Sequence, residues 1–326
     1  MGARPSSFAF TSAGALRVYN TSELLNLPSP TWLIDNLIPQ GGLASLYGAP
    51  ESTKSFMAID LALCVATGLP WHGRAVEKGF CIYVAAEGGP GIGKRVKAWL
   101  QHHNLPASKA NVGWVIETLA VSSGSGDIDT LMGRIEEIDQ APKLIVIDTL
   151  ARCFEGDENQ QEDMGEFIAG MGQLRHEYGA AILAVHHTNL SGDRERGNTA
   201  LRGGTDTMLA IERDKTTKEI TLSCTKQKDA EHFDPMTFEL QPVPEHESCV
   251  LVSTEQAKLE KTKQILGILA TSGPLSWDDW LSSTGAPKTT FHRHFAELKK
   301  SGEIIKENGL WRVKNENEFH DKKWHK

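Results

Sequence analysis

Residues 48 to 55 decide the fold, and they read Gly48-Ala49-Pro50-Glu51-Ser52-Thr53-Lys54-Ser55. They follow an apolar run at 42–47, and Phe56 opens the helix-patterned stretch behind them. A strand, a loop and a helix in this order are the context of a phosphate-binding loop, where backbone N–H groups and a helix N-terminus face the phosphates. Lys54 would reach the β- and γ-phosphates, and the Ser55 hydroxyl would ligate Mg²⁺. The sequence therefore predicts that residues 48–56 bind ATP and Mg²⁺.

One position of this loop departs from the usual motif. Thr53 stands where the motif has glycine. A β-branched residue strongly disfavours a positive φ. The loop must therefore either hold Thr53 at negative φ or carry strain there.

Length and composition fit a globular protein of ordinary type. The chain has 326 residues, of which 40% are hydrophobic and 23% charged, and it is long enough for two domains. No apolar run approaches the ~18 residues of a membrane span, and no signal-peptide core is present, so we expect no membrane partner. The cysteines have no metal-binding spacing, and Cys64 and Cys81 lie in apolar runs, as expected of core residues in a reducing cytoplasm.

Charge is unevenly distributed along the chain. Residues 255–326 hold 13 Lys+Arg against 10 Asp+Glu, whereas the remaining residues hold 21 against 32. A weakly basic C-terminal piece on an acidic body indicates a separate binding module.

The body, at residues 31–253, alternates buried-strand and helix patterns. The strand patterns occupy residues 43–47, 80–85, 144–147 and 181–185, and the helix patterns occupy residues 55–66, 92–101, 129–138 and 164–178. Continuous apolar strands that alternate with helices predict an α/β fold with a parallel sheet covered on both faces. Short strands at 208–212, 219–225 and 237–240 are expected to extend this sheet in antiparallel fashion.

Outside the body, the sequence predicts an N-terminal arm at 1–30, a polar linker at 254–263, a small domain at 264–315 and a polar tail at 316–326. The small domain reads as three helices and a hairpin. Asn308-Gly309 between two short apolar runs is a strong hairpin signal. This order of elements resembles a winged helix-turn-helix.

Two predicted strands end in carboxylates. Asp148 ends an apolar strand, and Glu87 follows another. Ligands of an α/β sheet sit outside the carboxyl ends of its strands, so Asp148 is expected to face the phosphate loop and to hold Mg²⁺ through water. Glu87 is placed to orient and deprotonate the water that attacks the γ-phosphate. The structural alternatives are an Asp that merely starts a loop and a Glu that caps a helix.

Further candidates lie downstream. The strand at 181–185 runs into His186 and His187, whose side chains point to opposite faces; we favour His187 as the sensor of the γ-phosphate. Arg202, Lys226 and Lys228 are cations that could reach the nucleotide of a neighbouring subunit. The plainer interpretations are local hydrogen bonding by the histidines and a solvated basic turn.

Seven strings in order carry a family resemblance. They are Tyr47-Gly48 with Lys54-Ser55-Phe56, Ala85-Ala86-Glu87-Gly88, Ile147-Asp148-Thr149-Leu150-Ala151-Arg152, Gly156-Asp157-Glu158-Asn159, His186-His187-Thr188, Leu201-Arg202-Gly203 and Lys226-Gln227-Lys228-Asp229. Together they resemble the RepA-like branch of RecA-fold ATPases, relatives of the DnaB helicases found in phages, prophages and plasmids.

The resemblance implies roles for these residues. It makes Lys54 and Ser55 the binders of phosphate and Mg²⁺, Glu87 the catalytic carboxylate and Asp148 the Walker B acid. It also implies a sensor among His186 and His187, and it makes Arg202, Lys226 and Lys228 candidates for action across a subunit interface. Lys228 stands where DnaB-type enzymes carry an arginine finger, and a lysine lacks the bidentate fork of arginine.

The third helix of the small domain offers a polar face opposite its apolar stripe. The residues expected to contact DNA there are Lys288, Thr289, Thr290, His292 and Arg293. A recognition helix beside a basic hairpin suits the major groove and its flanking phosphates. Winged helices also serve as protein-docking modules.

The function predicted from these features is that of a RecA-like, ATP-dependent DNA helicase of phage or plasmid replication. It would form a ring, expected to be a hexamer, and would move on single-stranded or forked DNA with replication proteins as further partners. The alternatives are a non-helicase ATPase such as a recombination mediator or a loader, and a DNA-binding regulator in which nucleotide is only an assembly switch.

Overall fold

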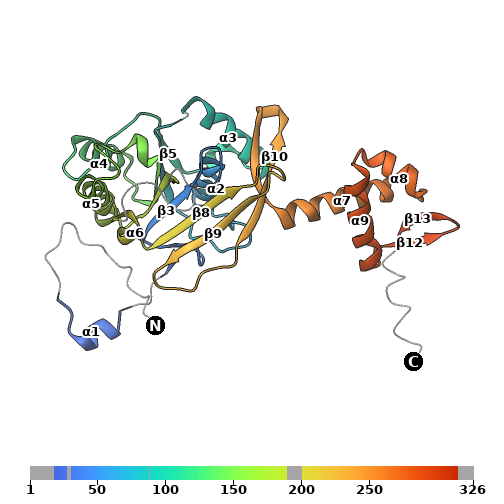
Figure 1. The fold of residues 1–326 in the computed structure, drawn as a ribbon, viewed down its shortest axis with the longest axis horizontal. Coiled ribbons are helices and arrows are strands. Elements are labelled where there is room, and N and C mark those ends of the chain that lie inside the picture. Colours follow the sequence, from blue (N-terminus) through green and yellow to red (C-terminus); the bar gives the residue numbers. More distant parts are fainter. Residues whose placement is uncertain (1–17, 28–30, 88, 189–199, 315–326) are drawn as a thin grey trace, which may run out of the picture. The chain divides into compact units, whose positions relative to one another are not determined.

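The computed structural model describes residues 18–27, 31–87, 89–188 and 200–314. The chain divides into two units, one ending at Val252 and the other beginning at Ser253 (Figure 1). Of the arm expected at 1–30, the described part carries the short helix α1 (Thr21–Leu25), which buries no residue. The tail expected at 316–326 lies outside the described residues. Among the helices that are described, none is both long and apolar enough to cross a lipid bilayer.

A nine-stranded sheet forms the centre of the first unit, in the order β11-β10-β9-β8-β3-β7-β6-β4-β5. Its strands are β3 (Leu43–Gly48), β4 (Phe80–Ala85), β5 (Val112–Val115), β6 (Pro142–Asp148), β7 (Ala181–His187), β8 (Thr207–Arg213), β9 (Ile220–Gln227), β10 (Met236–Val243) and β11 (Ser248–Ser253). A separate two-stranded sheet joins β1 (Trp32–Ile34) and β2 (Ile38–Pro39).

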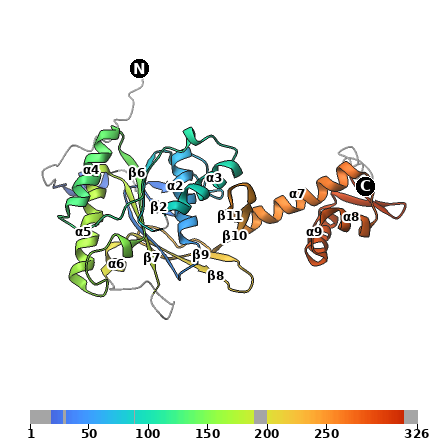
Figure 2. The same cartoon turned by 90° about the horizontal axis from the view of Figure 1, so that it is seen from above.

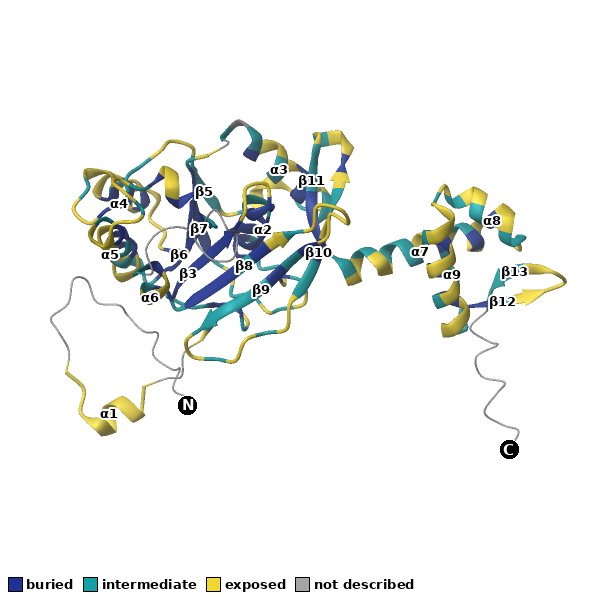
Figure 3. Cartoon of the chain, viewed as in Figure 1, coloured by how far each residue is buried: buried dark blue, intermediate teal, exposed yellow. Residues whose placement is uncertain are grey.

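The predicted α/β class with a largely parallel sheet is confirmed. The pairings along β8-β3-β7-β6-β4-β5 are all parallel, whereas β8 pairs with β9 in antiparallel fashion. The strands β3, β4 and β6 are almost entirely buried (Figure 3). The antiparallel extension is right for β9 and β10 but wrong for β8, which pairs in parallel with β3. The strands β5 and β11 were not predicted.

Helices cover both faces of this sheet, as expected. Figures 1 and 2 show α2 (Lys54–Thr67) and α3 (Gly89–His102) on one face, and α4 (Gly126–Ile138) and α5 (Gln161–Tyr178) on the other. The second face encloses a core that packs Phe167 and Met171 of α5 against Ile145 and Ile147 of β6. α2 is buried over most of its length, because its side chains are apolar nearly all round, and it ends at Gly68 with a φ of 82°.

The second unit has the expected three helices and hairpin. They are α7 (Thr254–Ser272), α8 (Trp277–Thr284), α9 (Lys288–Ser301), β12 (Ile304–Glu307) and β13 (Leu310–Val313). Asn308 and Gly309 form the turn with φ values of 50° and 84°, the conformation that an Asn-Gly hairpin requires. Trp280 and Phe291 are fully buried in a separate small core, and Leu275 bridges to Trp311 beside the hairpin.

Residues 254–263, expected as a linker, form the first half of α7. Strong helix formers fill this stretch, and the Ser253 side chain caps it by accepting a hydrogen bond from the Gln256 N–H. A polar, charged stretch is therefore not by itself a sign of an unstructured connection.

Candidate active site

The carboxyl ends of the parallel strands meet at one edge of the large sheet. Gly48 lies beside His187 in the pairing of β3 with β7, and Ala85 lies beside Asp148 in the pairing of β4 with β6. A cavity of ≈ 550 Å³ opens at this edge. It is lined by Pro50, Glu51, Thr53, Lys54, Ser55, Phe56, Glu87, Arg95, Thr149, His187, Arg213 and Leu240. The phosphate loop and residues at the carboxyl ends of four other strands, β4, β6, β7 and β8, therefore share one cavity.

Lys54 is the first residue of α2 and is held within the loop. Its Nζ donates hydrogen bonds to the carbonyl oxygens of Gly48 (3.0 Å) and Ala49 (2.8 Å). Burial lowers the pKa of the Lys54 ammonium, against the opposing effects of Asp148 and Glu87. The ammonium can therefore exchange two carbonyl partners for phosphate oxygens without crossing the cavity.

Position 48 requires glycine because another part of the chain approaches it closely. A Cβ at this position would lie 2.3 Å from the Ile211 carbonyl oxygen and 2.6 Å from the Ser52 Oγ. Because the first contact is with backbone, no side chain fits where the loop leaves β3.

Thr53 does not have a negative φ, so the loop carries strain at this residue. Thr53 has a φ of 74° and a ψ of 18° and stands at the N-cap of α2 without a capping side-chain hydrogen bond. Its hydroxyl donates instead to the Ser52 carbonyl oxygen. A left-handed conformation at a non-glycine residue costs roughly 1–3 kcal/mol. The backbone thus keeps the shape of a glycine-containing loop although the glycine is missing.

Asp148 is fully buried at the end of β6. Its Oδ2 accepts a hydrogen bond of 2.6 Å from the Tyr83 hydroxyl, whereas Oδ1 has no hydrogen-bond partner among the described residues. Burial raises the pKa of the Asp148 carboxyl, although the Tyr83 hydrogen bond and the nearby Ser55 hydroxyl act in the opposite direction. Mg²⁺ binds proteins through one or two oxygen ligands and keeps several waters. A buried, unpartnered carboxylate oxygen near the Ser55 hydroxyl therefore fits this ion.

Glu87 follows β4 and is exposed in the cavity. The buried Thr149 hydroxyl donates a hydrogen bond of 3.2 Å to the Glu87 Oε2. This contact ties the carboxylate to the residue that follows Asp148. Glu87 is therefore oriented by the end of β6 rather than by its own loop alone.

The two histidines at the end of β7 have different surroundings. His187 lines the cavity, and His186 is fully buried and is not one of the cavity-lining residues. Burial and the neighbouring Lys54 ammonium lower the pKa of His187, while Glu87 opposes this effect, so the surroundings favour the neutral ring. The structure thus places His187, the residue favoured as sensor, at the site.

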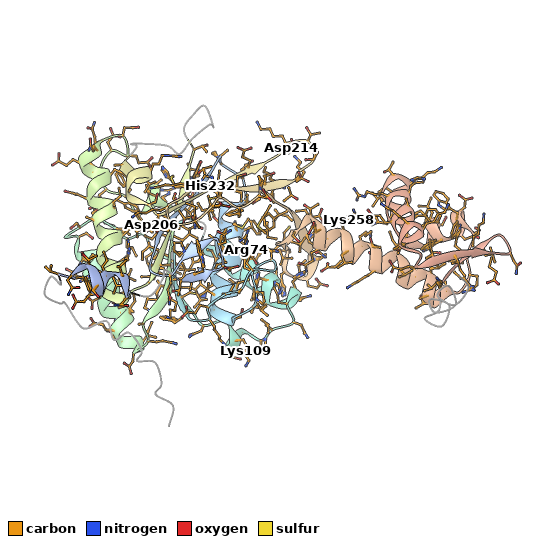
Figure 4. All side chains as sticks on the ribbon, turned by 90° about the horizontal axis from the view of Figure 1, so that it is seen from below. Arg74, Lys109, Asp206, Asp214, His232 and Lys258 are labelled. Carbon is orange, nitrogen blue, oxygen red and sulfur yellow. The ribbon has the colours of Figure 1, made fainter. Side chains whose placement is uncertain are left out.

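Arg202, Lys226 and Lys228 are not brought to this cavity. The Lys226 side chain reaches the start of β8, where its Nζ donates hydrogen bonds to the carbonyl oxygens of Arg202 and Thr205. Lys228 lies 3.5 Å from the Asp206 carboxylate, at the amino end of β8. Figure 4 labels Asp206 and Asp214, which stand at the two ends of this strand.

The amino and carboxyl ends of the parallel strands are far apart within one chain. β8 has 7 residues, so its ends are separated by roughly 20 Å. The three cations therefore cannot act on a nucleotide that is bound to their own chain.

Sequence reasoning missed Arg95, Arg213 and Thr149. The Arg95 guanidinium of α3 lies 4.5 Å from the centroid of the Phe56 ring, and both residues line the cavity. Arg213 ends β8 at the same edge. Arg213 had a usable signal, since it ends an apolar strand as Asp148 does, whereas Arg95 enters from the face of a helix and belongs to no motif.

In the second unit, the residues expected to contact DNA lie on α9. Lys288, Thr289, His292 and Arg293 are exposed, and Thr290 is half-buried.

Among solved structures, the fold is similar to that of a KaiC-like protein from the hyperthermophilic archaeon Pyrococcus horikoshii OT3. The two chains are 13% identical, with a TM-score of 0.47, over 68% of this chain and 93% of the other. No curated protein matches the sequence.

The family model of the AAA domain matches residues 18–193. This range covers more than half of the chain and includes Lys54, Glu87, Asp148 and His187, whereas Arg202 and the second unit lie outside it. The chain belongs to the AAA domain family of P-loop, nucleotide-binding ATPases.

Proposed function

We propose that the chain hydrolyses ATP in the cavity at the carboxyl edge of its sheet and uses this reaction to move on single-stranded DNA. The observation that carries the first half is the convergence of Lys54, Ser55, Glu87 and His187 on one cavity, with the Asp148 carboxylate buried beside it. These are the groups that phosphoryl transfer to water requires: cation, hydroxyl, acids and a hydrogen-bond donor.

Each group has a role that follows from its contacts. Lys54 would leave the loop carbonyls for the β- and γ-phosphates. The Ser55 hydroxyl, and the Asp148 carboxylate through water, would hold Mg²⁺, which would neutralise phosphate charge. Glu87, held by the Thr149 hydroxyl, orients the attacking water and takes its proton. The neutral His187 ring donates a hydrogen bond toward the γ-phosphate.

Further catalytic cations come, in this proposal, from a second copy of the chain. Arg202, Lys226 and Lys228 lie at the sheet edge opposite the cavity. If one chain presents this edge to the cavity of the next, the contact is head-to-tail, and such contacts generate a ring when the rotation between neighbours closes. A ring, expected to be a hexamer, would then hold ATP between neighbours and expose a channel for DNA.

Mixing defective chains tests this arrangement. Arg202→Ala and Lys228→Ala are each expected to lower turnover of the assembled protein while sparing the nucleotide affinity of an isolated subunit. Mixed with Lys54→Ala chains, they are expected to recover part of the missing turnover, because some interfaces then pair an intact loop with an intact cation. Turnover and subunit exchange are measured in the same samples. Absence of recovery at every ratio, in assemblies shown to exchange subunits, argues against action in trans.

Two other functions share the same cavity. A recombination mediator or loader would hydrolyse ATP without unwinding DNA, and a nucleotide-switched regulator would bind ATP without turnover. The carboxylate in place to activate water argues against the regulator, which needs no turnover. We favour the translocating motor over the mediator, with phage or plasmid replication as its setting, because the order of the sequence motifs resembles that of the DnaB-related branch. A strand-displacement assay on forked DNA, with ATP turnover measured in the same samples, separates the three: the motor unwinds and hydrolyses, the mediator only hydrolyses, and the regulator does neither.

We propose further that the second unit is a winged helix-turn-helix that binds duplex or forked DNA. The exposed cations of α9 include Lys288 and Arg293 near its start and Lys299 and Lys300 near its end. Glu297 is the one acid of this helix, and its carboxylate is paired with Lys258 of α7. The outer face of α9 is therefore basic along its whole length, which suits contact with phosphates beside a groove.

Removing residues 255–326 is expected to leave ATP hydrolysis measurable, since every phosphate-handling group lies upstream, but to weaken binding to duplex or forked DNA. Changing Lys288 and Arg293 to Glu in the full chain is expected to reproduce this weakening. Both changes should flatten the dependence of affinity on salt concentration, with the slope falling by about 1 for each DNA phosphate that the protein no longer neutralises.

Lys78 and Lys109, exposed lysines of the first unit, provide the matched control when both are changed to Glu. If affinity and its salt slope stay unchanged in the truncated and the reversed proteins, the second unit is a protein-docking module.

A further inference from the structure

A buried carboxylate outside the cavity joins the phosphate-loop helix to α3. Asp60 of α2 is 3% exposed. Its Oδ2 accepts a hydrogen bond from the Trp71 Nε1 (2.8 Å) and contacts the His72 Nε2 (3.0 Å). Its Oδ1 accepts a hydrogen bond of 2.6 Å from the Trp99 Nε1 of α3. None of these four residues lines the cavity, and none takes part in the proposed reaction.

The hydrogen-bonding chemistry of these side chains explains why the two indoles share the Asp60 carboxylate. An indole N–H can donate but never accept, so Trp71 and Trp99 both need an acceptor once they are buried. Asp60 is acceptor-only when ionised and satisfies both indoles, one on each oxygen. Leaving a buried donor without a partner carries the full desolvation penalty of that group. The cluster therefore fixes the distance and the register of the elements that it joins.

The packing of α3 on α2 also determines where Arg95 lies. Residues four apart lie on one face of a helix, which pairs Phe56 with Asp60 on α2 and Arg95 with Trp99 on α3. The two helices touch through both pairs: the Arg95 guanidinium lies 4.5 Å from the Phe56 ring centroid, and the Trp99 indole bonds to Asp60. The first contact faces the cavity and is partly exposed, whereas the second is buried one turn further on.

We propose that Asp60 and Trp99 are positioning residues for the nucleotide site, which hold α3 against α2 so that the Arg95 guanidinium faces the bound phosphates. This inference rests on the proposed function of the cavity. A cation–π contact at a partly exposed site is weak, so it cannot hold the long Arg95 side chain by itself. The buried indole–carboxylate hydrogen bond supplies a directional constraint one helical turn away.

The other half of the cluster has a different task. Trp71 and His72 pack against Phe238 of β10, with ring centroids 5.8 and 4.9 Å away. They join α2 to the far part of the sheet, and among the described residues no hydrogen bond or ring contact links either of them to α3. A metal site is not indicated, because the described residues contain no group of three or more His, Cys, Asp or Glu side chains arranged to hold an ion.

This division provides a matched pair of variants. Trp99→Phe and Trp71→Phe each remove one indole hydrogen bond to Asp60 and leave an aromatic ring in its place. Only the first loosens α3. We expect Trp99→Phe to lower kcat/KM for ATP roughly tenfold, within the range seen when a catalytic group is misplaced by about 1 Å. Trp71→Phe is expected to change kcat/KM less than about twofold, which is the size of deviation from additivity that unconnected sites ordinarily show.

Two further measurements separate positioning from reduced stability. In an Arg95→Ala background, Trp99→Phe is expected to have no further effect on kcat/KM, because it acts through Arg95. Hydrogen exchange of the amides at 92–100, followed without nucleotide, is expected to speed up in Trp99→Phe but not in Trp71→Phe.

Equal reductions of kcat/KM in both variants, additive reductions with Arg95→Ala, or unchanged exchange in α3 would each overturn the inference. The exchange measurement does not depend on turnover, so it still decides the positioning role if the intact chain proves not to hydrolyse ATP.

Discussion

Replacing Lys54 with Ala is expected to abolish ATP hydrolysis, with a reduction of at least ~10³-fold, as for other groups that neutralise charge in the transition state. The Lys54 ammonium is almost fully buried at the start of α2 and lies in the loop that faces the phosphates. No other cation of the same loop can replace it. The measurement is steady-state turnover of ATP by protein whose fold is checked by circular dichroism.

Lys143→Ala is the matched control for this variant. The Lys143 Nζ also makes a short contact, 2.8 Å to the Glu77 carboxylate, but it lies on β6 outside the cavity. Turnover is expected to be unchanged in this protein. Retained turnover in a well-folded Lys54→Ala protein would remove the assignment of the phosphate loop.

Replacing Glu87 with Gln is expected to slow hydrolysis by ~10²-fold or more, the usual scale for the removal of a general base. Nucleotide affinity should stay close to that of the unchanged chain, because Glu87 is exposed. Among the described residues, its carboxylate accepts a side-chain hydrogen bond from the Thr149 hydroxyl alone. An amide can still accept that hydrogen bond, so the geometry survives while the base is removed. Single-turnover kinetics and equilibrium binding of ATP are measured on the same preparation.

Glu77→Gln serves as the control, since Glu77 pairs with Lys143 and is not one of the residues that line the cavity. If binding and turnover fall together in Glu87→Gln, the carboxylate is structural and another acid performs the chemistry.

The sequence predicted the part of the fold that hydrophobic pattern specifies. β4 was placed with the bounds that it has in the structure, and β3 and β7 were found, because a continuous apolar run between turns marks a strand buried on both faces. β5 was missed because it is an edge strand of 4 half-buried residues, and Gly113 interrupts the short run between its two valines.

The direction of β8 could not be predicted, since parallel neighbours are normally joined through a long helix. The described helix before β8 is α6 (Ala200–Gly204), which is short. A short strand after a short helix gave no sign that it would pair in parallel with β3.

Within the site, residues at strand ends were predictable and residues on helix faces were not. Lys54, Glu87, Asp148 and His187 follow from the rule that ligands sit at the carboxyl ends of parallel strands. Arg95 depends on how α3 packs on α2, which no local pattern encodes. The φ of Thr53 was equally undecidable, because both outcomes are consistent with the residues around it.

ATP turnover by the intact chain with Mg²⁺, measured with and without single-stranded DNA, tests the central claim most directly. We predict turnover that Lys54→Ala abolishes and that single-stranded DNA stimulates. A folded chain that binds ATP but shows no turnover, with or without DNA, would contradict the assignment of Glu87, Asp148 and Lys54 to a hydrolytic site.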